Sequence, residues 1–276
     1  MKPHKAPETS PITMFKSFWQ NRQLIWQMTR REVAGRYRGS LLGLAWSFLN
    51  PLLMLLVYTF VFSVVFKSSW GIDSSESQAD FAIILFAGMI VFSLFAEIVN
   101  RAPSLIISNV NYVKKVVFPL EILPWVALGS VLFHSLVSLV VLLLLQLIVN
   151  FTLPWTALLF PLVILPLVFA CMGLAWFLAA LGVFVRDVGQ ITSVFTTVFM
   201  FLSAVFYPLT ALPQKYQNIL QLNPLVLIIA ESRNVLIFGK LPNWTSLSIT
   251  LVIGFGMAIA GFWWFQKMRK GFADVI

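Results

Sequence analysis

The residues that could do chemistry are few and scattered in this 276-residue chain. Its two histidines are His4 and His134, and its one cysteine, Cys171, excludes an intrachain disulfide or a cysteine zinc site. The sequence contains no GxxxxGKS/T phosphate-binding loop, no HExxH zinc motif and no GxSxG nucleophile motif. A membrane-embedded enzyme would need convergent acidic residues, and Glu97 and Glu121 are far apart in sequence. We therefore expect no catalytic residue, no metal and no cofactor on this chain.

His134 lies in an apolar run beside Ser135 and Ser138. Such a histidine could relay protons or could form a hydrogen bond to a neighbouring helix. A relay needs a second ionisable group at the same depth, whereas Glu97 and Glu121 fall near the ends of apolar runs. The hydrogen-bonding role is favoured, which weakens the hypothesis of a proton-coupled carrier.

The composition indicates a membrane protein. Hydrophobic residues make up 59% of the chain and charged residues 11%, against about 45–50% and about 25% in soluble domains. Six runs approach the length of about 20 apolar residues that a helix needs to span a bilayer. They cover residues 44–66, 81–99, 122–149, 162–185, 190–206 and 247–265. We predict one all-α transmembrane domain over residues 1–276, with a six-span bundle at 44–265.

The chain has a net charge of +9, and its basic residues are distributed unevenly between the two sides of the predicted membrane topology. If the amino terminus is cytoplasmic, most of the 19 Lys and Arg residues fall in cytoplasmic segments, as the positive-inside rule requires. Residues 1–43 and the tail at 266–276 are then both cytoplasmic, and the acidic, serine-rich stretch 68–80 is external. This placement gives no reason to expect a nucleic-acid partner and predicts a multi-pass protein of a cytoplasmic membrane.

Residues 207–244 resist assignment as a span. Their apolar stretch 225–230 is short and is followed by Glu231 and Arg233, and four prolines interrupt regular helix. One interpretation is a pair of re-entrant helices that dip in from the outside, which requires surrounding protein or water. The other interpretation is a helical cap that lies on the external surface of the same membrane.

The amino-terminal segment predicts an interfacial helix before the first span. On a helical wheel, five apolar residues fall within about 40° of one another: Phe15, Trp19, Trp26, Val33 and Tyr37. Arginines near anionic headgroups would add about 1 kcal/mol each to membrane binding.

Small residues at helical spacing predict close packing. Gly39 and Gly43 form a GxxxG pattern before span one, and Gly254, Ala258 and Gly261 share one face of span six. The pattern fits helix packing within one subunit or a dimer seam, and the first is favoured.

The loop at 101–121 has paired lysines, Lys114 and Lys115, and a hydrophobic tip. It could be a structured element that a soluble partner pushes against, or a solvated positive-inside loop.

Four stretches of sequence resemble one known family. They are TRREVAGRYRGSLLGLAWSFLNP at 29–51, YVKKVVFP at 112–119, VRDV at 185–188, and FYPL at 206–209 continuing through Asn223 and Pro224 to Arg233. They resemble, in order and in topology, the membrane subunit of bacterial ABC exporters for O-antigen, capsular and teichoic-acid polysaccharides. The sequence most resembles the O-antigen (lipopolysaccharide) export permeases.

The resemblance implies a half-transporter in the bacterial inner membrane. Two copies would form a continuous channel, and two separate ABC ATPase subunits, which bind ATP and Mg, would dock on the cytoplasmic side. The substrate would be undecaprenyl-pyrophosphate-linked O-antigen polysaccharide. Capsular polysaccharide, teichoic acid or another lipid or drug is the alternative substrate.

The resemblance also implies roles for particular residues. The ATPase-coupling residues would be Tyr112, Lys114, Lys115, Pro119, Glu121, Arg186 and Asp187. The arginines that meet the lipid pyrophosphate at the entrance would be Arg30, Arg31, Arg36 and Arg38. The external gate would contain Tyr207, Pro208, Asn223, Pro224, Glu231 and Arg233.

Aromatic rings offer flat apolar faces that can stack on sugar rings. The chain contains 26 Phe, 10 Trp and 5 Tyr, of which most should face lipid or the membrane interfaces. We take Tyr58, Phe60 and Phe62 as candidate pore aromatics.

Overall fold

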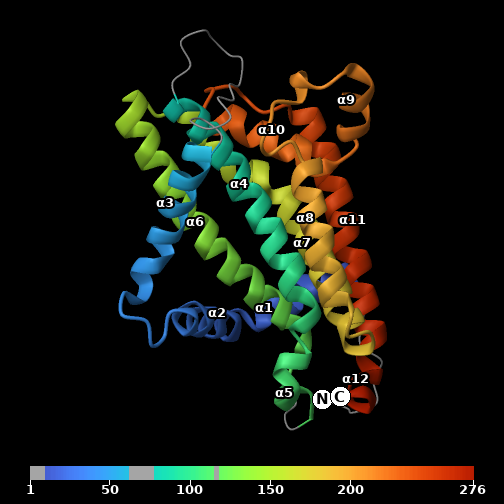
Figure 1. The fold of residues 1–276 in the computed structure, drawn as a ribbon. Helices are drawn as coiled ribbons and strands as arrows, with labels where there is room; N and C mark the ends of the chain where they lie inside the picture. The colour runs from blue at the N-terminus through green and yellow to red at the C-terminus, as the bar shows by residue number, and fades with distance from the viewer. Residues whose placement is uncertain (1–9, 62–77, 115–117) are drawn as a thin grey trace.

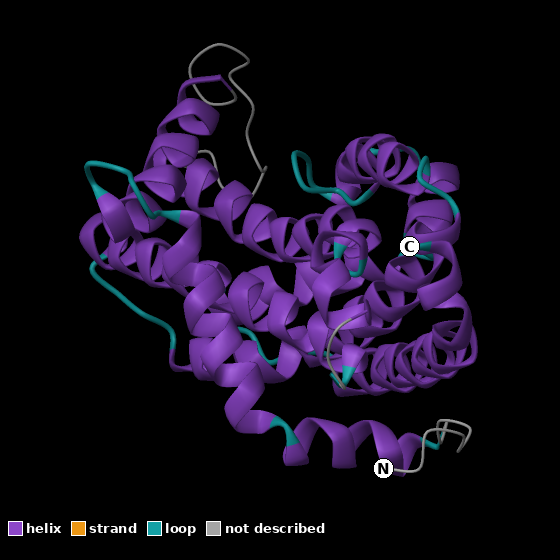
Figure 2. Cartoon of the chain, turned by 90° about the horizontal axis from the view of Figure 1, so that it is seen from below, coloured by secondary structure: helices purple, strands orange, loops and turns teal. Residues whose placement is uncertain are grey.

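The computed structural model describes residues 10–61, 78–114 and 118–276, and within these ranges it consists of helices joined by loops, without a β-strand (Figure 2). Phe62 and Lys115, a predicted pore aromatic and a predicted coupling residue, lie outside the described residues. The α-helices are α1 (Pro11–Gln20), α2 (Arg22–Arg36), α3 (Trp46–Tyr58), α4 (Gln78–Arg101), α5 (Val110–Lys114), α6 (Leu123–Asn150), α7 (Phe160–Phe184), α8 (Val188–Leu202), α9 (Gln214–Leu220), α10 (Pro224–Leu236), α11 (Trp244–Met268) and α12 (Phe272–Val275).

Four of the predicted spans correspond to helices that are long and apolar enough to cross a membrane. These stretches are Ala79–Ser104, Leu120–Asn150, Trp155–Phe184 and Trp244–Val275. The first and fifth predicted spans are shorter apolar helices, Trp46–Val61 and Val188–Leu202. The described residues therefore contain four candidate spans, or five if the bent pair α9 and α10 counts as one, where the sequence predicted six.

The helices run between two opposite ends of the molecule, and we name these by the elements they carry (Figure 1). The α5 end carries α1, α2, α5 and α12, and the α9 end carries α9 and α10. The predicted re-entrant segment forms α9 and α10, which meet at 96°. Pro224 opens α10, and the side chain of Asn223 caps it by accepting from Leu225 N at 3.0 Å.

Helices α7 and α11 form the tightest contact between long helices. A methyl group added at Gly254 or Gly261 would overlap the backbone of α7 at Pro166 and at Gly173. Ala258, between the two glycines, is fully buried. The small-residue face of α11 thus packs within one chain, as the favoured interpretation predicted, because only glycine lets two backbones approach this closely.

The GxxxG prediction for Gly39 and Gly43 is wrong. Both glycines have positive φ, of 84° and 50°, and neither has a neighbour within 4 Å of the position of a Cβ. They form the turn between α2 and α3, where the left-handed backbone conformation favours glycine.

The predicted interfacial helix is two helices, α1 and α2, which lie across the α5 end (Figures 1 and 2). The helix is interrupted at Asn21, whose side chain donates to Ser17 O at 2.8 Å. Trp19 and Trp26 are exposed, but Val33 is buried instead of sharing their face. Ile25 packs with residues of α6, so α2 rests on the helix bundle.

Candidate functional site

A polar cavity lies between α3, α4 and α6. Its volume is about 350 Å³, and its walls include Asn50 of α3, Ser93 of α4 and Ser135 and Ser138 of α6. Helix α3 contacts the other helices sparsely and buries only Ser47 and Leu55. Polar groups are costly inside a membrane unless they face water or other polar groups. The cavity thus brings hydroxyl and amide groups from three helices together around one shared space.

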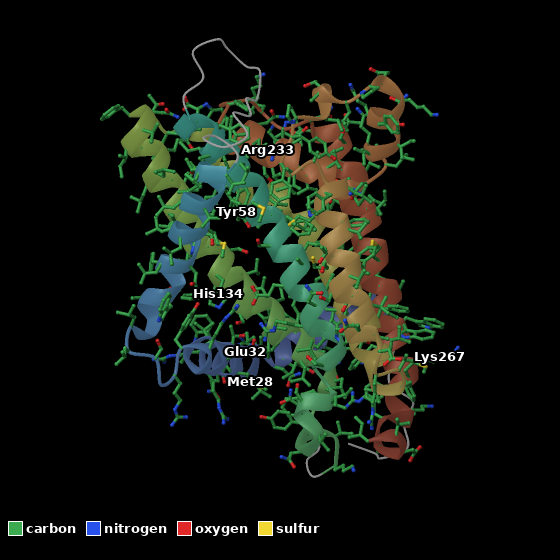
Figure 3. The ribbon with its side chains drawn as sticks, viewed as in Figure 1. Met28, Glu32, Tyr58, His134, Arg233 and Lys267 are labelled. Carbon is green, nitrogen blue, oxygen red and sulfur yellow. The ribbon has the colours of Figure 1, made fainter. Side chains whose placement is uncertain are left out.

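Tyr58, His134 and Glu32 follow one another from the middle of the molecule toward the α5 end (Figure 3). Tyr58 and His134 line the cavity, and the ring of Tyr58 also contacts Phe206 at 6.3 Å between centroids. Of the other predicted pore aromatics, Phe60 has 60% of its surface exposed and is absent from the cavity wall. Of the two candidate pore aromatics that the structure describes, Tyr58 lines the cavity and Phe60 does not.

The predicted hydrogen bond of His134 to another helix is confirmed. Its Nδ1 lies 3.3 Å from the hydroxyl of Tyr37, the residue that caps the carboxyl end of α2. Burial raises the pKa of the Tyr37 phenol, and the charge of Glu97 also raises it, while that of Arg36 opposes the shift. The phenol is therefore neutral at physiological pH and keeps its proton for hydrogen bonding.

Four charged residues join α2 to α4 at the mouth of this cavity. Arg36 Nη1 lies 2.6 Å from Glu97 Oε1, and Arg101 Nη1 lies 3.6 Å from the same atom. Arg101 also pairs with Glu32. The two positive and two negative charges cancel, and all four side chains are partly exposed to solvent. The network thus connects the interfacial helix to the last turn of α4, directly before the loop that carries α5.

Two further cavities extend the polar path toward the α5 end. One, of about 640 Å³, is lined by Glu32, Arg36, Glu97 and Arg101. It shares Arg36 and Glu97 with the first cavity. The next, of about 300 Å³, is lined by Glu32, Arg31 and Tyr112, among others. The second and third cavities share Glu32, so the three cavities are neighbours between Tyr58 and α5.

The four predicted entrance arginines differ in their surroundings. Arg36 reaches the cavity mouth and pairs with Glu97. Arg30, Arg31 and Arg38 are exposed, and no ion pair holds them in the part of the chain that the structure describes. These three side chains are free to meet an anionic group outside the bundle.

Arg233 anchors the α9 end. Its side chain is buried and donates to three backbone carbonyls, from Nε to Ile84 at 3.0 Å, from Nη1 to Ala204 at 3.0 Å and from Nη2 to Val205 at 2.6 Å. Gly88 makes room for the guanidinium, because a Cβ there would collide with it. The arginine thus joins α10 to α4 and to the chain after α8.

Three of the other predicted gate residues are also held by hydrogen bonds. Glu231 is buried and accepts from Asn243 N and from Asn234 Nδ2, both at 3.2 Å. Asn223 donates to Leu202 O at 3.2 Å and to Ser203 Oγ at 3.1 Å. Tyr207 donates to Phe201 O at 2.7 Å. Pro208 lines an outer cavity of about 400 Å³ that Arg233 and Lys240 also line.

The predicted coupling residues gather at the α5 end. Tyr112 stacks on Phe118, with ring centroids 4.4 Å apart, and Pro119 precedes the short turn that opens α6. Arg186 and Asp187 are exposed in the turn between α7 and α8. Lys114 is exposed at the end of α5, so these residues form a surface that a partner could reach.

Glu121 has a different environment from the other coupling residues. Its carboxylate accepts from Ser17 of α1 at 3.0 Å and pairs with Arg269 at 2.7 Å, and its carbonyl accepts from Trp176 at 3.0 Å. It therefore fixes the start of α6 between α1, α7 and the end of α11. Sequence reasoning missed Arg269, which it counted only as part of the positive-inside bias.

The described residues contain no cluster of three His, Cys, Asp or Glu side chains that could hold a metal ion.

The chain is similar in sequence to known proteins over most of its length. The profile of the ABC-2 type transporter family matches residues 23–237. The O-antigen export system permease protein RfbA of Myxococcus xanthus is 29% identical over 96% of this chain and 100% of its own length. The protein of the same name from Klebsiella pneumoniae is 25% identical over 90% of this chain and 93% of its own length. The polysialic acid transport protein KpsM of Escherichia coli is 25% identical over 82% of this chain and 89% of its own length.

Proposed function

The chain belongs to the ABC-2 type transporter family, and on this premise we propose which substrate it carries and how. It is the channel-forming permease of an ATP-driven exporter that moves undecaprenyl-pyrophosphate-linked O-antigen polysaccharide across the bacterial inner membrane. The chain does not hydrolyse ATP itself. Its relatives named O-antigen export permeases, matched over nearly their whole length, support this choice of substrate.

The polar cavity between α3, α4 and α6 is the observation that carries the proposal. A polysaccharide is rich in hydroxyl groups and insoluble in lipid, so it needs a conduit with hydrogen-bonding walls. Asn50, Ser93, Ser135 and Ser138 offer such groups, and Tyr58 offers a ring face for stacking. A second cavity that shares Arg36 and Glu97 with the first lies toward α5, which is the direction from which a cytoplasmic substrate would arrive.

The exposed arginines of the entrance provide the first contact with the lipid pyrophosphate. Arg30, Arg31 and Arg38 can form charge-assisted bonds with phosphate oxygens. Arg36 joins them only when it leaves Glu97. In this scheme both termini are cytoplasmic, α2 lies on the inner membrane surface, and α9 and α10 are re-entrant helices of an external gate.

A second copy of the chain completes the conduit. Helix α3 leaves most of its apolar side chains exposed, including Phe48, Leu52 and Leu56, and the cavity that it lines is only partly enclosed. Two copies would close the two open sides against each other and form a continuous channel through six spans of each subunit. Two ABC ATPase subunits, with ATP and Mg, dock at the α5 end.

The proposal is tested by purification and by deletion. The isolated chain in detergent is expected to hydrolyse no ATP, and to co-purify with an ABC ATPase when both are expressed. Deletion of the gene is expected to abolish surface O-antigen. ATP hydrolysis by the isolated chain, or unchanged surface glycan after deletion, contradicts the proposal. Export that survives ATP depletion but stops when the proton gradient collapses indicates a carrier instead.

A capsular polysaccharide is the alternative substrate. The similarity to the polysialic acid transport protein favours it. In this case deletion removes a capsule and leaves O-antigen intact, so that one comparison of both surface glycans separates the two candidates. A drug or another lipid as the substrate predicts that both glycans persist.

A further inference from the structure

The segment from Arg269 to Ile276 folds back on the α5 end, although the sequence analysis treated it as part of a tail. It continues α11 through a short turn, Arg269–Gly271, into α12. In Figure 1, α12 lies at the same end as α5 and beside it, and the two elements are in contact. We define residues 269–276 as the clamp segment.

Arg269 ties the clamp segment to the loop before α6. Its Nη1 pairs with Glu121 Oε2 at 2.7 Å, and its Nη2 donates to Phe118 O at 3.0 Å. Phe118 in turn stacks on Tyr112 of α5. One guanidinium therefore holds the chain on the α6 side of the predicted coupling loop.

Phe272 ties the same segment to α7. It is fully buried, and its ring lies 5.5 Å from that of Phe265 and 6.1 Å from that of Phe184. Phe184 is the last residue of α7 and precedes the turn that carries Arg186 and Asp187. This contact places an aromatic anchor directly behind the second predicted coupling site.

Lys114 completes the set of contacts. Its Nζ donates to the backbone carbonyl of Ile276 at 2.7 Å, which joins α5 to the end of α12. Helix α5 has only five residues, and a helix this short is not stable without packing partners. The clamp segment supplies such partners.

We propose that the clamp segment holds α5 and the α7–α8 turn in one fixed arrangement, and that this arrangement is the docking surface for the ATPase subunit. Phe272 and Arg269 are positioning residues, because they act through Phe184, Phe118 and Glu121. The inference rests on the proposed function, which supplies the ATPase. In this arrangement α5 and the α7–α8 turn, which are separated by some 70 residues of chain, do not move relative to each other and bind the partner as one rigid body.

The test measures the arrangement first. Spin labels at Asn111→Cys and Arg186→Cys, both exposed, report the distance between α5 and the turn in the full-length chain in lipid nanodiscs. Cys171 is fully buried and does not take up label. We expect a narrow distance distribution in the parent chain and a broad one after Phe272→Ala. The matched control is Phe160→Ala, which removes an equally buried ring from the opposite end of α7 and leaves the distribution narrow.

The second measurement is the affinity for the partner ATPase. Loss of such a coupling contact changes affinity by about 2- to 30-fold, so we expect Phe272→Ala to weaken ATPase binding by about tenfold at equal amounts of folded permease. Phe160→Ala keeps the affinity of the parent chain. If Phe272→Ala does not fold, Arg269→Gln removes the other anchor from a partly exposed site and is expected to act in the same direction.

The two measurements distinguish a failure of the inference about the clamp segment from a failure of the proposed function. A distance distribution and an ATPase affinity that do not change in the clamp variants overturn the inference, while the proposed function stands. A parent chain that binds no ATPase overturns the proposed function, and with it the docking role, whatever the spin labels report. Equal effects of Phe160→Ala and Phe272→Ala show a general loss of packing and also overturn the inference.

Discussion

The seam between α7 and α11 and the space between α3, α4 and α6 are built on opposite principles. At the seam, Gly173, Gly254 and Gly261 bring two backbones into direct contact and leave no room for a further atom. Around the cavity, α3 contributes two buried residues, and polar side chains face about 350 Å³ of open space. The first arrangement gains dispersion energy from close packing, and the second leaves polar groups facing open space. The molecule thus combines a rigid frame with a loosely packed polar wall.

The largest expected effect lies in the seam. Gly261→Leu forces a side chain into the backbone of α7 at Gly173, and we expect a loss of about 3 kcal/mol in stability. Thermal unfolding of the purified protein in detergent measures it. Gly256→Leu is the matched control, because Gly256 is on the same helix and has nothing within 4 Å of its Cβ position. If both variants unfold alike, the seam has no special role.

The anchor of the α9 end is expected to rank second. Arg233→Lys leaves one ammonium group where a planar guanidinium serves three carbonyls, and we expect a loss of about 2 kcal/mol. Thermal unfolding again gives the value. Lys240→Ala, an exposed change in the same outer cavity, is expected to change stability by less than about 0.5 kcal/mol.

The charged network at the cavity mouth is expected to contribute less. Glu97→Gln releases Arg36 and Arg101 from their shared carboxylate, and because all the side chains are partly exposed the loss should stay below about 1 kcal/mol. Raising the salt to about 1 M should shrink the difference between variant and parent, because the Debye length falls to about 3 Å. A difference that is independent of salt would mean that Glu97 acts through packing and not through charge.

The cavity wall is expected to have the smallest effect on stability and a large effect on transport. Ser138→Leu should change the unfolding free energy by less than about 0.5 kcal/mol. Loss of one hydrogen bond to substrate, of about 1 kcal/mol, should lower glycan export about fivefold. Leu136→Ala, an exposed position on the same helix, is the control for both measurements. Full export by Ser138→Leu would place the conduit elsewhere.

Several features of the fold follow directly from local patterns in the sequence. The long apolar runs predicted α4, α6, α7 and α11, because a bilayer demands a minimum length of apolar helix. The glycine and alanine spacing in α11 predicted a packing face, and the exposed Trp19 and Trp26 agree with an interfacial segment. The fifth run predicted a helix at 190–206, whereas α8 ends at Leu202, because apolar composition alone does not say where a helix ends.

Partners across the fold were decided by the tertiary structure. Arg233 was identified as a gate residue, yet its three carbonyl partners come from two separate stretches of chain. Glu121 was assigned to the coupling surface, yet it pairs with Arg269, which was counted only as a cytoplasmic charge. Gly39 and Gly43 matched a packing motif and instead form a turn. A motif specifies residue types at a spacing, but whether the backbone is helical there depends on what packs against it.

The sequence by itself therefore determined that this chain is a membrane protein, which family it resembles and which segments are apolar. These three properties depend on composition and on local spacing. Only the tertiary structure decided which polar groups share the cavity, which charges neutralise one another and how the end of the chain reaches α5. Those contacts join residues that are far apart in sequence. Local sequence patterns do not predict such contacts, because each partner's neighbours in the chain are the same whether or not the contact forms.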